Sequence, residues 1–255
     1  MADGAAGQRL VLWDIDHTLL DGGGVSREAY AAAFARLVGR PMRRLAPMAG
    51  RTDLLIALET LELNGVEPGD DLVERFNLAV ADEMDARADA LRARGTALAG
   101  AKAAIAALTA TATTAATATT AATGAGVEPV VRQTVLTGNM RRLAELKLAA
   151  FDLADGLDLA AGAYGDDAYD RADLLPVALK RSADRFGHPF TGRDAVIVGD
   201  TLLDVATARS GGAAMIAVAT GATPAADLAA AGADLVLPDL ADTAALVDAV
   251  SARLA

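Results

Sequence analysis

The sequence predicts an α/β fold in which helices cover both faces of a parallel sheet and a helical segment is inserted after the first strand. Two observations predict it. Across residues 98–255, short apolar runs alternate with stretches of helical periodicity, the pattern of a Rossmann-like parallel sheet core buried on both sides. Residues 22–97 show helical periodicity alone, so we assign them to an inserted α-helical cap domain and residues 1–21 and 98–255 to the core.

The composition limits the classes of partner. The chain has 255 residues, of which 53% are hydrophobic but only 4% aromatic, so Ala, Leu and Val must fill a sizeable core. A formal net charge of −11 argues against nucleic acid or an anionic membrane as a partner, because both require a basic face. The absence of Cys excludes disulfides and thiolate chemistry. Since neither a signal peptide nor a membrane-spanning run is visible, we expect a cytoplasmic protein.

The first strand is expected over residues 10–14, an apolar run that stops at aspartate. Glycines at 22–24 and the segment 95–100 flank the cap and predict flexible hinges. Between them, apolar residues recur at helical spacing, which predicts an all-helical module over residues 25–94. They are Tyr30, Phe34, Leu37 and Val38, then Leu54, Leu55, Leu58 and Leu61, then Val73, Phe76, Val80 and Met84.

The core continues as alternating strands and helices. Strands are expected at residues 133–136, 195–198, 214–218 and 234–237, and helices at 139–150, 174–186, 202–210 and 225–231. Residues 109–126 contain only Ala, Thr and Gly. A tract of this kind buries too little surface to order itself, so we expect a mobile, exposed loop within the core.

Two aspartates end the first strand. Asp14 and Asp16 occupy alternate positions, so their side chains point to the same side and can meet one ligand at the carboxyl end of the strand. Such a pair attracts a metal ion or shares a proton. Taken alone, the same residues also fit a solvated turn, where Asp is common.

Two further strand ends carry polar groups. The segment from Thr137 to Asn139 follows one strand and places a hydroxyl beside the amides of a helix start, which is half of a phosphate-binding loop or an ordinary helix cap. Asp200 follows another strand, and Asp204 lies one helical turn later, where a first-turn charge is also common. Because all these strand ends meet at one edge of the sheet, a shared site explains them better than coincidence.

Together these motifs resemble those of the haloacid dehalogenase (HAD) superfamily of hydrolases, in particular its phosphoglycolate-phosphatase-like members with a helical cap. Residues 14–18 match the Asp-x-Asp-x-Thr motif, Thr137 the Ser/Thr motif, and the segment from Asp200 to Asp204 the acidic motif. The resemblance implies that Asp14 is a nucleophile that forms an aspartyl-phosphate and that Asp16 is the general acid and base.

The resemblance also implies a cofactor and a phosphate site. The cofactor is Mg²⁺, held by the Asp14 carboxylate, the Asp16 backbone carbonyl and Asp200, with Asp204 orienting the site. The phosphate oxygens would meet hydroxyls and amides of two motif loops, those of Thr18, Thr137, Gly138 and Asn139.

One departure from the family pattern concerns positive charge. The family usually supplies a Lys before the third motif, and residues 170–174 contain none, so Arg171 is the candidate replacement. Arg171→Ala is expected to impair turnover while leaving folding intact. Lys180 is expected to be solvated, and Lys147, about three turns into the helix after Thr137, to lie too far away. In the cap, residues 50–53 resemble a segment that family caps place facing the active site. Arg51 would then bind a substrate carboxylate or phosphate, although an arginine just before a Thr-capped helix fits the sequence equally well.

The expected function is Mg²⁺-dependent hydrolysis of a phosphomonoester, with a small phosphorylated metabolite such as phosphoglycolate as the substrate. Two alternatives stay open. One is a phosphosugar mutase, which needs the same aspartate pair. The other is a catalytically quiet binding or regulatory protein of the same fold, which the missing Lys and the Ala/Thr tract favour. The sequence predicts no oligomeric state.

Overall fold

A five-stranded parallel sheet forms the centre of the computed structural model, which describes residues 8–118 and 130–252. Its strands are β1 (Gln8–Trp13), β4 (Val130–Val135), β5 (Ala195–Gly199), β6 (Ala214–Val218) and β7 (Leu235–Leu237). They lie in the order β4-β1-β5-β6-β7. Because β1 pairs with both β4 and β5, the three strands that carry the polar motifs end side by side. The predicted α/β fold is confirmed.

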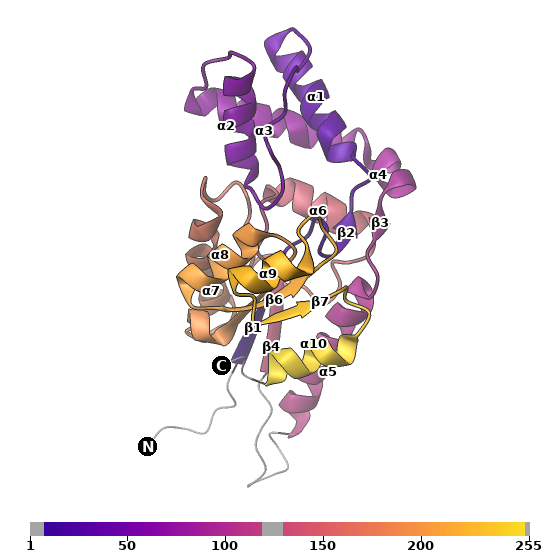
Figure 1. The fold of residues 1–255 in the computed structure, drawn as a ribbon, viewed down its shortest axis with the longest axis vertical. Coiled ribbons are helices and arrows are strands. Elements are labelled where there is room, and N and C mark those ends of the chain that lie inside the picture. Colours follow the sequence, from indigo (N-terminus) through magenta and orange to yellow (C-terminus); the bar gives the residue numbers. More distant parts are fainter. Residues whose placement is uncertain (1–7, 119–129, 253–255) are drawn as a thin grey trace.

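Helices cover both faces of the sheet (Figure 1). Side chains alternate along β1, so Val11 and Trp13 pack with α5 (Ala101–Ala118) and α10 (Thr243–Ser251). Leu10 and Leu12 pack on the opposite face, with α7 (Leu174–Phe186), α8 (Leu202–Gly211) and α9 (Ala225–Ala231). This arrangement buries β1 from Leu10 to Trp13, and polar groups gather at its carboxyl end.

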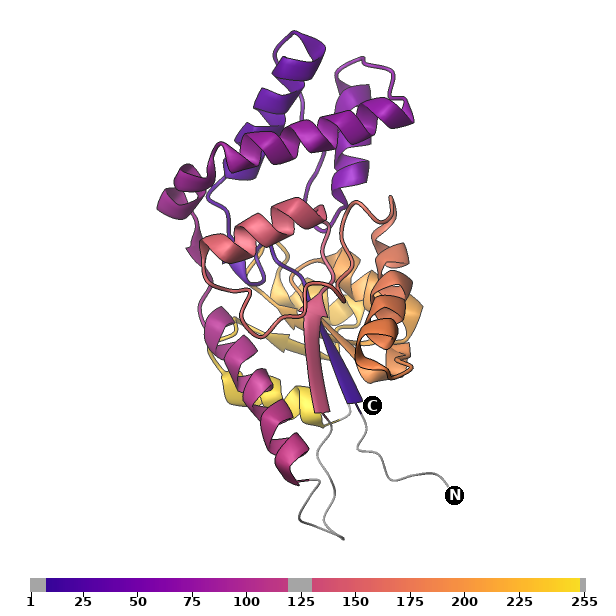
Figure 2. The ribbon, with the colours of Figure 1, turned by 180° about the vertical axis from the view of Figure 1, so that it is seen from behind.

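One core helix lies between the sheet and the cap (Figure 2). This helix, α6 (Arg141–Ala150), directs Ala144 and Leu148 toward the core. Its Leu143, with Met140 just before it, packs against the apolar cluster of the cap. The segment that follows Thr137 therefore contacts both parts of the molecule.

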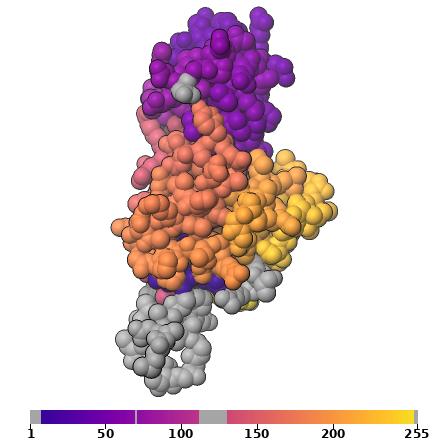
Figure 3. Space-filling model, turned by 90° about the vertical axis from the view of Figure 1, so that its left-hand side faces the viewer, coloured from indigo at the N-terminus to yellow at the C-terminus, as the bar shows by residue number. Residues whose placement is uncertain are grey.

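The cap consists of four helices, which are α1 (Val25–Val38), α2 (Asp53–Leu63), α3 (Asp70–Asp85) and α4 (Ala88–Arg94). It forms a separate lobe seated on the core (Figure 3). Its two connections pair as an antiparallel ribbon, β2 (Leu20–Asp21) with β3 (Thr96–Ala97). Glycine is needed beside this ribbon, because a Cβ at Gly23 would lie 2.6 Å from the carbonyl oxygen of Arg94 and one at Gly95 would lie 2.7 Å from that of Asp21.

The Ala/Thr tract differs from its prediction. Residues 109–118 continue α5 instead of forming a loop, because Ala favours helix and the first turns of α5 are anchored in the core by Ala104, Ile105 and Leu108. The rest of the predicted loop, up to residue 126, lies outside the described residues. Within the described ranges, no helix is long and apolar enough to cross a bilayer.

Candidate active site

Asp14 continues the line of β1 beyond the last strand residue. Its amide donates to the carbonyl of Val198 on β5 at 2.9 Å, and its side chain is buried. One carboxylate oxygen lies 3.0 Å from Nη2 of Arg171. Burial and, to a smaller extent, the nearby carboxylate of Asp204 raise the pKa of Asp14 to about 6 despite the guanidinium of Arg171. A buried carboxylate at this position therefore lacks enough positive charge around it.

The β5–α8 turn supplies two more carboxylates. Both oxygens of Asp204 are engaged: Oδ2 accepts from the amide and hydroxyl of Thr201 at 3.0 and 2.6 Å, and Oδ1 accepts from Arg171 at 2.5 Å. Among the described residues, Asp200 accepts one side-chain bond, from the Thr18 hydroxyl at 3.3 Å. Burial and the carboxylates of Asp14 and Asp204 raise the pKa of Asp200 to about 8.

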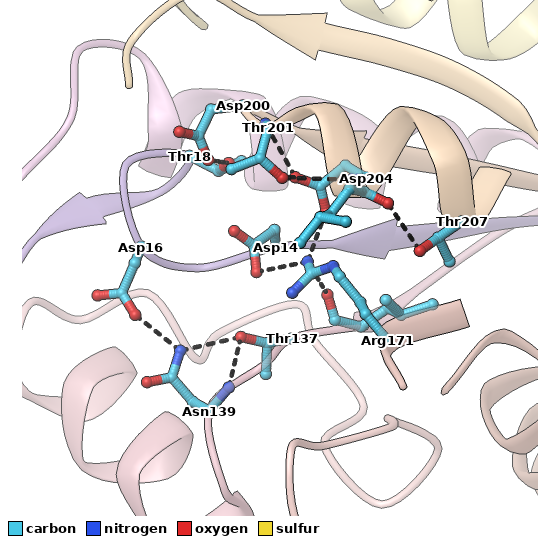
Figure 4. Close-up of polar contacts among 12 residues, drawn as sticks. Asp14, Asp16, Thr18, Thr137, Asn139, Arg171, Asp200, Thr201, Asp204 and Thr207 are labelled. Atoms are coloured by element: carbon cyan, nitrogen blue, oxygen red, sulfur yellow. Dashed lines mark hydrogen bonds and ion pairs between the residues drawn. The ribbon is translucent and has the colours of Figure 1, made fainter. Parts of the chain in front are cut away.

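Ligand oxygens of Asp14, Asp200 and Asp204 lie within 4.8 Å of one another, and all three residues are buried. In the part of the chain that the structure describes, the guanidinium of Arg171 is the one cation in contact with them, so a divalent cation fits the charge of this cluster. Because Asp204 is occupied by its own hydrogen bonds, Asp14 and Asp200 offer the free oxygens. The side chain of Asp16, for which the sequence predicted an acid-base role and not a bond to the metal, is not in this cluster and lies away from it (Figure 4).

Arg171, proposed from the sequence to replace the usual lysine of the family, lies beside Asp14. It opens a short 3₁₀ helix, η1 (Arg171–Asp173), and its side chain is only 3% exposed. Its Nη2 contacts Asp14 and Asp204 and reaches the carbonyl of Leu136 at 3.4 Å. Nη1 donates no hydrogen bond to any residue in the described ranges, and Arg171 lines the cavity above Asp14. Arg171 thus holds Asp14 of the first motif and Asp204 of the acidic motif, and its Nη1 is available to a ligand in the cavity.

The prediction for Lys147 is wrong. Its side chain is 2% exposed, and Nζ donates to both carboxylate oxygens of Asp16 at 2.8 and 2.7 Å and to Oδ1 of Asn139 at 2.6 Å. Two facts explain the error. Helix α6 starts only at Arg141, so Lys147 lies in its second turn, and the helix crosses above the edge of the sheet instead of leading away from it. Lys180 is exposed, as predicted, and the structure adds its ion pair with Asp184.

Asp16 is therefore held in a second polar cluster, distinct from the three carboxylates. Burial tends to raise its pKa, but the ammonium of Lys147 and hydrogen bonds from Lys147 and Asn139 bring that pKa below its ordinary value. Nδ2 of Asn139 bridges Asp16 and the Thr137 hydroxyl at 2.8 and 2.9 Å (Figure 4). Asn139 does not cap α6, since Met140 occupies the cap position. Its side chain instead links two motif loops.

The cap closes over these groups. Its Asp53 donates its amide to the carbonyl of Gly138 and accepts from the amide of Met140, both at 2.7 Å. The Thr52 hydroxyl donates to the carbonyl of Tyr169 at 2.7 Å. A cavity of about 450 Å³ lies beneath this contact, and the residues lining it include Asp14, Asp16, Arg27, Arg51, Asn139, Arg171 and Asp200. The cap is thus bonded to the loop predicted to bind phosphate.

Arg51 lines the cavity, as its predicted role requires, but its guanidinium is already paired. Both terminal nitrogens donate to the carboxylate of Glu59, one of them at 2.6 Å. A substrate anion would have to compete with Glu59 for this arginine. Binding of a substrate by Arg51 stays a prediction.

Gly138→Ala is expected to loosen the cap, because a Cβ at this position would overlap the carbonyl of Arg51 and lie 3.2 Å from Nη1 of Arg171. Overpacking of this kind costs about 1–3 kcal/mol of unfolding free energy, measurable by urea denaturation. Gly69→Ala is the matched control, since nothing lies within 4 Å of its Cβ and only a glycine N-cap is lost, at under about 1 kcal/mol. Equal stability of the two variants would contradict a tight cap contact at Gly138.

Comparisons with known proteins agree with this architecture. Residues 173–243 match a family model described as HAD-hydrolase-like, and no curated protein matches the chain by sequence. Similar solved structures include CbbY from Rhodobacter sphaeroides in complex with phosphate, at 18% identity and a TM-score of 0.64, covering 92% of this chain and 96% of that chain. A predicted phosphoglycolate phosphatase from Haemophilus somnus has 15% identity and a TM-score of 0.60, covering 96% and 100%. A putative beta-phosphoglucomutase from Bacteroides vulgatus has 17% identity and a TM-score of 0.59, covering 98% and 92%.

At these identities the solved structures establish the shared fold, and the family model adds sequence similarity over the acidic motif. The resemblance to HAD-like hydrolases predicted from the three motifs is confirmed.

Proposed function

We propose that this HAD-like hydrolase is a magnesium-dependent phosphatase that releases inorganic phosphate from a small phosphorylated metabolite, such as phosphoglycolate, through an aspartyl-phosphate. One observation carries the proposal: Asp14 lies between Arg171 and two further carboxylates on the wall of a cavity covered by the cap. A nucleophilic carboxylate needs this combination of nearby cationic charge and shelter from water.

The residues present fit Mg²⁺. Oxygen ligands are what this ion prefers, and the free oxygens of Asp14 and Asp200 would hold it, with the backbone carbonyl of Asp16 as a further donor. When bound, the ion would neutralise charge on the phosphoryl oxygens and on the crowded carboxylates. The raised pKa of Asp200, about 8, supports a site in which a cation is needed to keep the carboxylate ionised.

In the first half of the proposed reaction, a carboxylate oxygen of Asp14 attacks phosphorus, and the bond from phosphorus to the leaving oxygen breaks. Asp16, which carries a proton at the start of this step, donates it to that oxygen and becomes the carboxylate that Lys147 and Asn139 hold. Nη1 of Arg171, which has no partner among the described residues, and the amides beside Gly138 bind the phosphoryl oxygens.

In the second half, Asp16 takes a proton from water, and the resulting hydroxide attacks phosphorus. The bond between phosphorus and Asp14 breaks, which regenerates the carboxylate and frees inorganic phosphate. The cap limits bulk water in both halves, and a cavity of about 450 Å³ favours a small substrate.

The experiment is phosphate release from purified protein against a panel of phosphorylated metabolites and para-nitrophenyl phosphate. We expect turnover with Mg²⁺, loss of at least about 90% of it after chelation, and recovery when Mg²⁺ is added back. Release that chelation leaves unchanged would remove the metal from the proposal.

Two other outcomes would favour the alternatives. Transfer of phosphate between two hydroxyls of one sugar phosphate, without release, would indicate a mutase. Binding without turnover of any compound would indicate a catalytically quiet protein.

A further inference from the structure

We infer that Lys147 is a positioning residue for the proposed phosphatase reaction: it fixes the Asp16 carboxylate in the orientation from which Asp16 exchanges protons with the leaving oxygen. The inference rests on the proposed function and extends it to a residue outside the matched motifs. Lys147 does not line the cavity, so it acts on the substrate only through Asp16.

The ammonium of Lys147 has three hydrogen-bond acceptors among the described residues. They are the two carboxylate oxygens of Asp16 and Oδ1 of Asn139, at 2.6 to 2.8 Å. An ammonium that is 2% exposed is costly to bury unless its donors are satisfied. The three acceptors offset that cost, and the buried ammonium in turn fixes the position of the Asp16 carboxylate, which a solvated lysine would not do.

Asp16 needs such support because its side chain is 36% exposed and lines the cavity. It belongs to a loop whose next residue, His17, has a φ of 58°. Asn139 donates to one oxygen of Asp16 through Nδ2, and Lys147 donates to both of its oxygens through Nζ. Together they restrict the carboxylate to one orientation, which a group that transfers protons to a fixed atom requires.

The two buried basic residues described above, Arg171 and Lys147, contact different acidic residues. Arg171 contacts Asp14 and Asp204, and Lys147 contacts Asp16 and Asn139, with no shared partner among the described residues. Loss of Lys147 therefore leaves the nucleophile and its arginine in place. Asn139 keeps its Nδ2 contacts with Asp16 and the Thr137 hydroxyl when Lys147 is lost, so the main defect is expected in the proton-transfer role of Asp16.

Lys147→Met tests the inference with two substrates that differ in their leaving group. Para-nitrophenolate is stable without a proton, whereas an alkoxide from glycerol 2-phosphate is not. We expect kcat for glycerol 2-phosphate to fall by about a hundredfold, kcat for para-nitrophenyl phosphate by less than about tenfold, and KM for both to stay within about twofold. Asp16→Asn should show the same dependence on the leaving group.

Lys180→Met is the matched control, because Lys180 is exposed and paired only with Asp184. Equal losses on both substrates for Lys147→Met, or no loss, would overturn the inference. If that variant fails to fold, the comparison is made with Lys147→Gln, which keeps one donor toward Asp16 and should show the same pattern with a smaller ratio. A wild-type protein inactive on every phosphomonoester would count against the proposed function instead.

Discussion

Asp14→Asn is expected to abolish phosphate release, by at least about a thousandfold, while the protein stays folded. The amide cannot form the proposed aspartyl-phosphate, and the neighbouring carboxylates have other roles. Asp200 would hold the proposed Mg²⁺. Asp204 has both oxygens engaged by Thr201 and Arg171. Asp16 is held by Lys147. The measurement is phosphate release with Mg²⁺ over a wide range of enzyme concentration.

The same variant should be at least as stable as the wild type in the presence of a chelator. The amide oxygen of Asn can still accept the hydrogen bond from Arg171, and one of three clustered carboxylates is gone. The pKa of Asp14 rises from 3.8 to about 6 on folding, mainly through burial. A carboxyl that holds its proton more tightly when folded makes the wild type less stable as pH rises through this interval, and Asp14→Asn removes that loss.

Thermal unfolding at pH 5 and pH 8 checks the second expectation. Retained turnover would exclude Asp14 as the nucleophile. A large drop in melting temperature would instead show that the ionised carboxylate stabilises the fold, and the loss of activity could then no longer be assigned to chemistry alone.

Elements with strong local boundaries were predicted closely. β6 (Ala214–Val218), α7 (Leu174–Phe186) and α9 (Ala225–Ala231) match the expected limits. The two helices end at Gly187 and Gly232, both with positive φ, so glycine in the sequence marks where each helix ends. The same local logic placed Asp14, Thr137 and Asp200 at strand ends, and sheet topology alone brings those ends together.

The contacts that the sequence could not predict depend on where whole helices run in space. Lys147 reaches Asp16 because α6 starts late and runs over the sheet edge, which no periodicity within α6 reveals. The pairing of Arg51 with Glu59 joins the segment before α2 to the second turn of that helix. The sequence could not reveal it, because the same position of Arg51 also suits an arginine that faces the substrate. A buried lysine among apolar helix positions was the one available hint, because Leu143, Ala144 and Leu148 mark the inward face that Lys147 shares.

Arg171→Ala is expected to remove activity and also to lower the free energy of unfolding by about 3–5 kcal/mol. The prediction from sequence alone, impaired turnover with intact folding, assumed an accessible side chain. The guanidinium is 3% exposed and is the single cation contacting Asp14 and Asp204 within the described residues. Its removal leaves two buried carboxylates facing each other without a counter-ion, so stability and activity fall together.

Arg171→Lys separates the charge from the geometry. A lysine restores a positive charge beside Asp14 but cannot reproduce the planar fork that contacts Asp14, Asp204 and the Leu136 carbonyl together. We expect it to recover more activity than stability. Arg185→Ala is the control, because that arginine is 57% exposed and its pair with Asp158 is worth at most about 1 kcal/mol. Urea unfolding and phosphate release on the three variants give the comparison. If Arg171→Ala were as stable as Arg185→Ala, the carboxylate cluster would have to be neutralised by protons, and Arg171 would serve the chemistry alone.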